Sequence, residues 1–247
     1  MKGGFPVIRE IKKKMVILNN RVPFQAEVKT YLKELELMDW IYMHLRLSGS
    51  GLSKENIDTI IHGGYVLDAK IEEHLLIDRL KELRSYLYRL TDMEADLSFT
   101  MIGDMHRIIT GGNGETHFRK SHPVLLEYKY NPVMPSEIPS AMGELLAFAK
   151  KEDEFPDYIL KAVKVHNKLI EIYPFKEGNE YLARAAMYYI LIRKGYPLAA
   201  IQMSEQEYND SVIAYLKKGD CGTLYKALMR AVYNRLELMI QLTSQSR

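Results

Sequence analysis

One short segment of the sequence carries residue types that can do chemistry: the polar turn YPFKEGNEYLAR, residues 173–184, which leads into an apolar helical stretch. Gly178 and Asn179 let the backbone turn sharply and point N–H groups toward the coming helix axis. A helix N-terminus adds about half a positive charge, so a turn of this kind favours an anion. The Asn179 amide can donate a further hydrogen bond, and Arg184 lies one turn into the helix.

A carboxylate in the same turn, Glu177, is a candidate magnesium ligand that could bridge a cation to phosphates. Two interpretations stay open at this point: a site for a magnesium nucleotide, or a helix-capping turn that binds nothing. The next two residues, Glu180 and Tyr181, do not favour an anion, because one is acidic and the other bulky and uncharged.

The elements that must position this turn are helical almost throughout. Apolar residues recur at three- and four-residue spacing, which predicts helices over 24–47, 54–62, 69–90, 99–110, 136–151, 157–172, 180–194, 204–217 and 222–243. Ser53 is expected to cap the second helix and Asp68 to open the third, while Asp96 or Ser98 opens the fourth. The segment SEQE at 204–207 has the pattern of a capping box.

The pattern changes over residues 111–135, where glycines, prolines and short runs of β-formers predict an exposed hairpin or flap. The fold class is therefore all-α (mainly α) with a short β-hairpin flap. We expect an N-terminal extension at 1–24 and a single domain at 25–247.

Composition excludes several classes of protein. The chain has 247 residues and a formal charge of +2, with no dense basic run beyond KKK at 12–14, so no nucleic-acid partner is predicted. No apolar run is long enough to span a membrane, and no apolar leader opens the chain. The single cysteine, Cys221, allows no internal disulfide. The expected location is cytoplasmic.

The turn YPFKEGNEYLAR resembles the signature of the Fic (Fido) family, His-Pro-Phe-x-Asp/Glu-Gly-Asn-Gly-Arg-x-x-Arg. The flanks match too, since RAAMYYILIRKGYP resembles the helix that follows the family motif and His166 falls where many members have a histidine. The resemblance covers about residues 25–200. It implies the Fic/Fido helical fold and transfer of AMP from ATP, with magnesium, to a protein hydroxyl.

The resemblance also implies roles for single residues. Glu177 takes the magnesium position, the Gly178-Asn179 backbone and amide take the phosphate positions, and Arg184 takes the position that contacts a terminal phosphate or an inhibitory glutamate. The segment GETHFRKSHPVLL resembles the flap that docks a target protein, with His117, Phe118, Arg119 and Lys120 in place of the usual Tyr-Arg.

Three departures fall on positions that do chemistry. Tyr173 stands where the family has its general-base histidine, and a phenol stays protonated at neutral pH. Glu180 stands at the second motif glycine and Tyr181 at the first arginine. One cation is lost and one anion gained, which makes the pocket less favourable to a polyanion. We expect Glu180 to occupy the anion site and pair with Arg184, four residues on.

The segment WIYMHLRLSGSG resembles the family's inhibitory helix, which places a serine or threonine four residues before a glutamate. Here His44 takes the serine position and Ser48 the glutamate position, while Gly49 is kept. The chain lacks both the general-base histidine and the inhibitory glutamate. This is consistent with a site that has no transferase activity to inhibit.

The remaining histidines and lysines are expected to have structural or solvent-exposed roles. His166 is expected to be a hydrogen-bonded core histidine, His117 and His122 exposed, and Lys120 and Lys176 solvated. The histidines in HRIIT and HLLID have no second ligand at metal spacing, so no metal site is assigned to them.

Two functions follow from the sequence. The first is a Fic-fold binding or regulatory module with a degenerate nucleotide site and a protein partner docking at the flap. The alternative is an active transferase of AMP or another phosphate-containing group, with an altered donor or a relocated base. The donor, the target and any self-association stay open.

Overall fold

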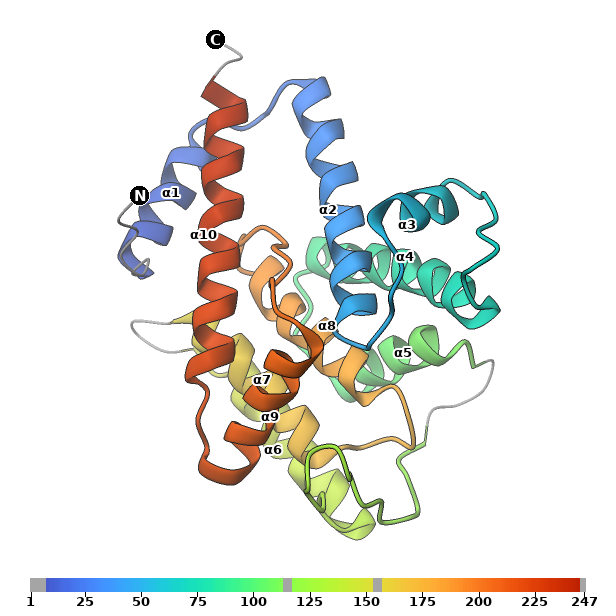
Figure 1. Cartoon of the computed structure of the whole chain (residues 1–247). Helices are drawn as coiled ribbons and strands as arrows, with labels where there is room; N and C mark the ends of the chain where they lie inside the picture. The colour runs from blue at the N-terminus through green and yellow to red at the C-terminus, as the bar shows by residue number, and fades with distance from the viewer. Residues whose placement is uncertain (1–7, 113–116, 153–156, 245–247) are drawn as a thin grey trace.

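The computed structural model describes residues 8–112, 117–152 and 157–244, and these ranges are almost entirely helical (Figure 1). The helices are α1 (Ile8–Asn19), α2 (Ala26–Arg46), α3 (Lys54–Ile61), α4 (Ile71–Asp92), α5 (Phe99–Thr110), η1 (Pro135–Glu137), α6 (Ile138–Lys150), α7 (Tyr158–Ile172), α8 (Asn179–Ile192), α9 (Glu205–Lys218) and α10 (Gly222–Ser244). The all-α fold class is confirmed.

Capping residues set several of the helix boundaries where the sequence predicts them. Ser53 and Ser98 each accept a hydrogen bond from a backbone N–H in the first turn of α3 and α5. Ser204 and Glu207 form the expected capping box at α9. The prediction that Asp68 opens α4 is wrong, since that helix begins at Ile71 behind Lys70, whose backbone N–H donates to Glu73.

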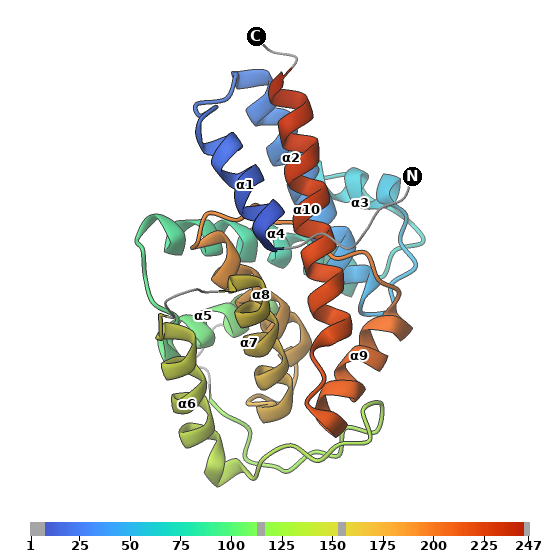
Figure 2. The ribbon, with the colours of Figure 1, turned by 90° about the vertical axis from the view of Figure 1, so that its left-hand side faces the viewer.

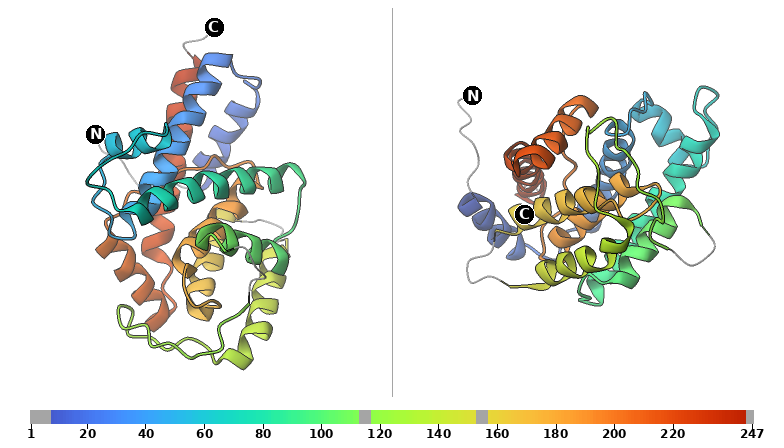
Figure 3. Two further views of the ribbon diagram at one scale, coloured as in Figure 1. Left: turned by 90° about the vertical axis from the view of Figure 1, so that its right-hand side faces the viewer. Right: turned by 90° about the horizontal axis from the view of Figure 1, so that it is seen from below.

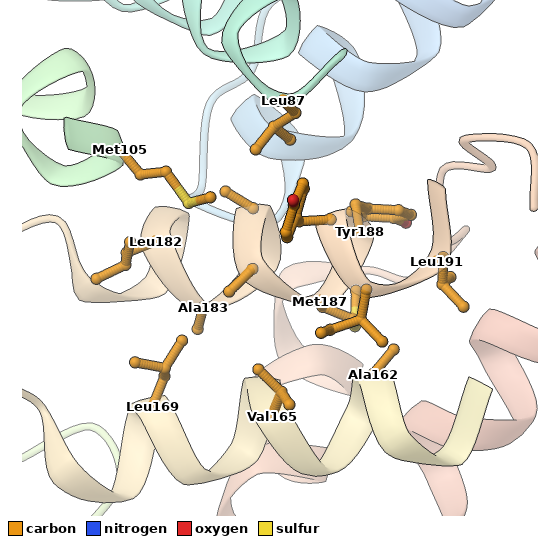
Figure 4. Close-up of a cluster of buried hydrophobic side chains, with 14 of the residues drawn as sticks. Leu87, Met105, Ala162, Val165, Leu169, Leu182, Ala183, Met187, Tyr188 and Leu191 are labelled. Atoms are coloured by element: carbon orange, nitrogen blue, oxygen red, sulfur yellow. The ribbon is translucent and has the colours of Figure 1, made fainter. Parts of the chain in front are cut away.

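The centre of the fold is α8, which is apolar on nearly every face and is buried from Leu182 to Ile192. A helix without a polar face has to be enclosed by others. Figure 4 shows α7 lining one side of it and α4 and α5 closing the other, through the side chains of Ala162, Val165, Leu169, Leu182, Ala183, Met187, Leu87 and Met105.

The two ends of the described chain pack together. Helix α1 lies along α10 (Figure 2), with Ile11 buried between them. Arg21 ties the connection after α1 to the end of α10, because its guanidinium donates to the Ile240 carbonyl at 2.7 Å and to the Thr243 hydroxyl at 2.8 Å. The part of the 1–24 extension that the structure describes is therefore built into the fold; residues 1–7 lie outside the described ranges.

The flap is an irregular strap rather than a hairpin. Its described part shows one isolated antiparallel bridge, between Leu125 and Tyr130. Pro123 and Pro132 flank this bridge, and neither has an N–H to extend a ladder, so the predicted β-hairpin is reduced to a single pair. Residues 113–116, at the start of the predicted flap, lie outside the described ranges.

No helix in the described ranges is long and apolar enough to cross a lipid bilayer.

We predict that Leu182→Ala lowers the free energy of unfolding by about 2–5 kcal/mol, because it leaves a cavity between α7 and α8 at a fully buried position. Leu126→Ala, on the flap, is the control: this side chain is 81% exposed, so the change should stay within about 0.5 kcal/mol. Urea unfolding monitored by circular dichroism measures both. Equal losses would contradict the central placement of α8.

Candidate functional site at the N-terminus of helix α8

The loop between α7 and α8 carries the turn that the sequence singles out. Tyr173 ends α7 in a left-handed conformation, with φ of 49°, and its N–H donates to the Leu169 carbonyl at 2.8 Å. Gly178 begins α8 with φ of 77°. A Cβ at this glycine would lie 3.2 Å from the Ile109 side chain of α5, so glycine suits both the backbone and the space.

Asn179 stabilises this loop rather than presenting its amide to a ligand. Its Nδ2 donates to the Phe175 carbonyl at 2.9 Å, and its Oδ1 accepts from the Phe175 N–H at 3.0 Å. Both ends of the buried amide are therefore engaged. The expectation that this side chain donates to a phosphate is not met in this conformation, although the first N–H groups of α8 still lie at a helix N-terminus.

His106, a histidine that no sequence pattern selects, supports the loop from α5. The His106 Nε2 donates to the Glu177 carbonyl at 3.0 Å, and its ring stacks on Phe175 with centroids 3.9 Å apart. Burial lowers the pKa of His106, and the neighbouring Glu177 opposes that shift. The two partners lie 71 residues apart in the chain, so no local spacing signals the contact.

Arg119 joins the flap to the same loop. Its buried guanidinium donates to the carbonyls of Tyr173 at 2.7 Å, Ser121 at 2.8 Å and Ile172 at 3.3 Å, and also to that of Val133. A cation at the C-terminal end of α7 also complements the helix dipole. Arg119 is thus a structural anchor and is not exposed to a docking target.

The other three flap residues behave differently. Phe118 is half-buried, with its ring centroid 5.7 Å from that of Phe175, while His117 and Lys120 are exposed. His122 is exposed as well and contacts the Pro132 carbonyl. Only His117 and Lys120 of the four predicted flap residues present their side chains to solvent.

The phenol at the general-base position pairs with the acid that replaces the motif glycine. The Tyr173 hydroxyl donates to a Glu180 carboxylate oxygen at 3.0 Å. Burial, followed by the charge of Glu180, raises the pKa of Tyr173 further above its ordinary value. The hydroxyl therefore keeps its proton at neutral pH and serves as a hydrogen-bond donor.

Arg184 faces away from Glu180 and toward α2. Its Nε donates to the His44 Nδ1 at 3.2 Å and its Nη2 to the Ser48 hydroxyl at 3.0 Å. The predicted Glu180–Arg184 ion pair is wrong: Glu180, in the first turn of α8, is directed at Tyr173, whereas Arg184 points into the interface with α2. The structure thus brings together the two inhibitory-segment positions and the last motif arginine.

The surroundings of Arg184 are aromatic and lack an acid. The guanidinium carbon lies 4.7 Å from the Tyr181 ring centroid and 5.4 Å from that of Tyr208. Within the described part of the chain no carboxylate pairs with this fully buried cation, and its Nη1 and the His44 Nε2 have no hydrogen-bond partner. Burial, followed by the charge of Arg184, holds the pKa of His44 well below its ordinary value.

His166 belongs to a buried hydrogen-bond network behind Arg184, which agrees with its predicted role as a core histidine. Its Nε2 lies 2.7 Å from the Tyr208 hydroxyl and its Nδ1 2.9 Å from the Asn167 Oδ1. Asn167 in turn donates to the Cys221 sulfur at 3.5 Å. Burial lowers the pKa of His166 to about 4.

Three carboxylates face the same region from different elements. Burial, and then the charges of Glu180 and Glu205, raise the pKa of Glu127 on the flap. Gly49, with φ of 80°, ends the turn after α2, and a Cβ there would lie 3.0 Å from a Glu205 carboxylate oxygen. The mouth of the site is therefore surrounded by acids from the flap, α8 and α9.

The magnesium candidate Glu177 lies on the exposed outer side of the turn, beside the solvated Lys176. Among the residues that the structure describes, no three histidine, cysteine or acidic side chains come together as metal ligands would.

Comparison with known proteins shows which proteins this chain resembles. Residues 96–191 match the model of the Fic/DOC family. The chain is 24% identical to the protein adenylyltransferase Fic of Aedes aegypti over 229 residues, and 25% identical to protein adenylyltransferase fic-1 of Caenorhabditis elegans over 227 residues. These alignments cover 90% of this chain but 44% of each relative, so the chain spans less than half of their length.

Solved structures share the fold. A Fic domain containing signaling protein from Bacteroides thetaiotaomicron superposes with a TM-score of 0.79 at 16% identity, covering 96% of this chain and 98% of that one. Fic-1 (residues 134–508) from C. elegans gives a TM-score of 0.77 at 20% identity, covering 95% and 70%. The fold and the turn define a helical domain with its site at a helix N-terminus. Over residues 96–191 the chain resembles the Fic/DOC family, and its fold is that of solved Fic-domain structures.

We predict that Arg119→Lys lowers the free energy of unfolding by about 1–3 kcal/mol, because an ammonium cannot serve carbonyls that the guanidinium fork reaches together. Amide hydrogen exchange should also accelerate in the variant at position 119, whose backbone N–H donates to the Pro174 carbonyl at 2.9 Å in the wild type. Lys120→Arg, at the exposed neighbour, is the matched control. Unchanged exchange in Arg119→Lys would show that the flap is held by other contacts.

We predict that stability falls as pH is lowered from about 6.5 to about 4, because the folded-state pKa values of His44 and His166 lie below the unfolded value, so the unfolded chain binds more protons. Each histidine adds a slope of up to about 1.4 kcal/mol per pH unit. His166→Gln should flatten the dependence measured by urea unfolding. His62→Gln, at an exposed histidine of the α3 cap, should not. Equal slopes in all three proteins would contradict the buried, neutral state of His166.

Proposed function

We propose that this chain is a Fic-fold binding or regulatory module that does not transfer AMP. The observation that carries the proposal is the state of Arg184, the last motif cation. It is buried against His44 and Ser48 and is not directed at the first turn of α8. A cradle for a triphosphate needs its cations aimed at the anion, and here the arginine is engaged in a contact with α2 of the same chain.

The acids at the mouth support the same proposal. Glu180 occupies the first turn of α8, and the charges of Glu180 and Glu205, after burial, raise the pKa of Glu127. Two like charges 4 Å apart repel by about 4 kcal/mol at an effective dielectric of 20. ATP with magnesium brings further negative charge to this place, so the residues present do not fit that group, and we derive no catalytic step through it.

The base position argues against transfer on chemical grounds. The relatives are named protein adenylyltransferases, and AMP transfer to a hydroxyl needs an acceptor for its proton. Tyr173 is a protonated donor to Glu180 and cannot take that role at neutral pH. Loss of general-base help costs roughly 10²–10⁴ in rate.

A binding role leaves the flap as the surface for a protein partner. Val124, Leu126 and Met134 expose 62%, 81% and 52% of their surface there. In the part that the structure describes, the flap has few internal ladder bonds, since a single bridge there joins Leu125 to Tyr130. Its unpaired backbone groups suit the addition of an extended peptide by edge pairing.

The test is incubation with ATP labelled on its α-phosphate, together with a protein lysate. We predict no labelled protein with the wild type, and labelling at least about 100-fold above background with the triple variant Tyr173→His/Glu180→Gly/Tyr181→Arg, which restores base, space and cation. Tyr173→His alone should gain little, because the acid remains.

Labelling by the wild type that Tyr173→Phe abolishes would overturn the proposal in favour of an active transferase. Repeating the assay with other labelled nucleoside triphosphates tests a changed donor, and labelling with any of them by the wild type would contradict the proposal equally.

A further inference from the structure

A second concave surface lies far along α2 from the Arg184 contact. It is a groove with a volume of about 830 Å³ between the first half of α2, the second half of α4 and the connection after α1. Figure 3 shows α2 crossing α4, with α1 and that connection above the C-terminal half of α4. The volume falls in the range typical of small-molecule sites.

The walls of the groove are apolar and aromatic. They include Val22, Phe24, Leu32, Tyr88 and Met239. Val22 is 61% exposed, and the side chains of Phe24 and Leu32 are half-buried, so this apolar surface meets water. A smaller hollow of about 290 Å³ continues the groove toward the end of α8.

The floor is rigid and close to neutral. The Arg84 Nε donates to the Glu36 carboxylate at 2.9 Å, and the Tyr88 hydroxyl donates to the same oxygen at 2.7 Å. This cluster ties α4 to α2 with side chains that are mostly withdrawn from solvent. Glu36 is therefore neutralised by Arg84 and does not compensate the charges on the rim.

The rim carries a surplus of positive charge. Lys29 and Lys33 lie one turn apart on α2, and Arg89 faces them from α4. Among the residues that the structure describes, none of these three side chains forms an ion pair; Arg89 lies over the Tyr86 ring at 5.7 Å. Asp92 is the one acid on the rim, which leaves a surplus of two positive charges.

We propose that this groove binds a small amphipathic anion, with an apolar or aromatic body against Phe24, Leu32 and Tyr88 and an anionic head at Lys29, Lys33 and Arg89. Like charges one helical turn apart destabilise a helix unless an anion compensates them. Exposed apolar wall and cationic rim together match one ligand chemistry. The site is separate from the turn at α8, so this inference does not rest on the proposed function.

The test uses 8-anilinonaphthalene-1-sulfonate, an aromatic anion that fluoresces when its body leaves water. We expect saturable binding at one site, weakened about tenfold by Lys29→Glu/Lys33→Glu. Lys217→Glu/Lys218→Glu changes the net charge equally at the exposed end of α9 and should leave binding unchanged. Val22→Ser should weaken binding several-fold without affecting folding, because the side chain is exposed.

Competition experiments distinguish recognition of the anionic head from binding of the apolar tail alone. Dodecanoate should displace the dye, and dodecyltrimethylammonium, with the same tail and a positive head, should not. Glu180→Gln, at the α8 turn, should leave dye binding unchanged. Equal binding by the wild type and Lys29→Glu/Lys33→Glu, equal displacement by both competitors, or no saturable binding up to about 1 mM dye would each overturn the proposal.

Discussion

The contact on which the candidate site depends is that between the Arg184 guanidinium and the C-terminal turn of α2. A buried cation without a carboxylate partner is costly, and such a group persists only where hydrogen bonds and aromatic faces compensate it. Here His44 and Ser48 accept two of its N–H groups, and the rings of Tyr181 and Tyr208 lie beside it. Burial and then this contact keep His44 neutral. The contact also joins α2 to α8 and withdraws positive charge from the helix N-terminus that would otherwise attract an anion.

The residues that replace the family's motif residues are consistent with this Arg184 contact and with one another. Tyr173 and Glu180 satisfy each other across the mouth of the turn, where a base and an open space would serve catalysis. The Asn179 side-chain amide hydrogen-bonds to the Phe175 backbone. Arg119 on the flap and His106 on α5 each donate a hydrogen bond to a backbone carbonyl of the loop. The loop is thereby pre-organised without a ligand. Pre-organisation of this kind suits a module that presents a fixed surface, whereas a catalytic turn directs its groups at a substrate.

The sequence predicted the helical fold well, because long amphipathic periods and side-chain caps such as Ser53 and Ser204 are local signals. The resemblance aligned Ser48 with the inhibitory glutamate position, but the contact of His44 and Ser48 with Arg184 was not predicted. Prediction from the sequence failed where long-range packing decides. The Glu180–Arg184 pair was inferred from helical spacing, but tertiary contacts with α2 and Tyr173 override a pair worth a few tenths of a kcal/mol. The roles of His106 and Arg119 depend on partners more than 50 residues away, which no local pattern reveals.

The most direct test of this account is a crystal of the wild-type protein grown with a large excess of ATP and magnesium. We expect no triphosphate at the first turn of α8, with Arg184 still donating to Ser48 and Tyr173 still donating to Glu180. A triphosphate seated on the Gly178–Asn179 turn, with Arg184 turned away from α2 to meet it, would contradict the central claim.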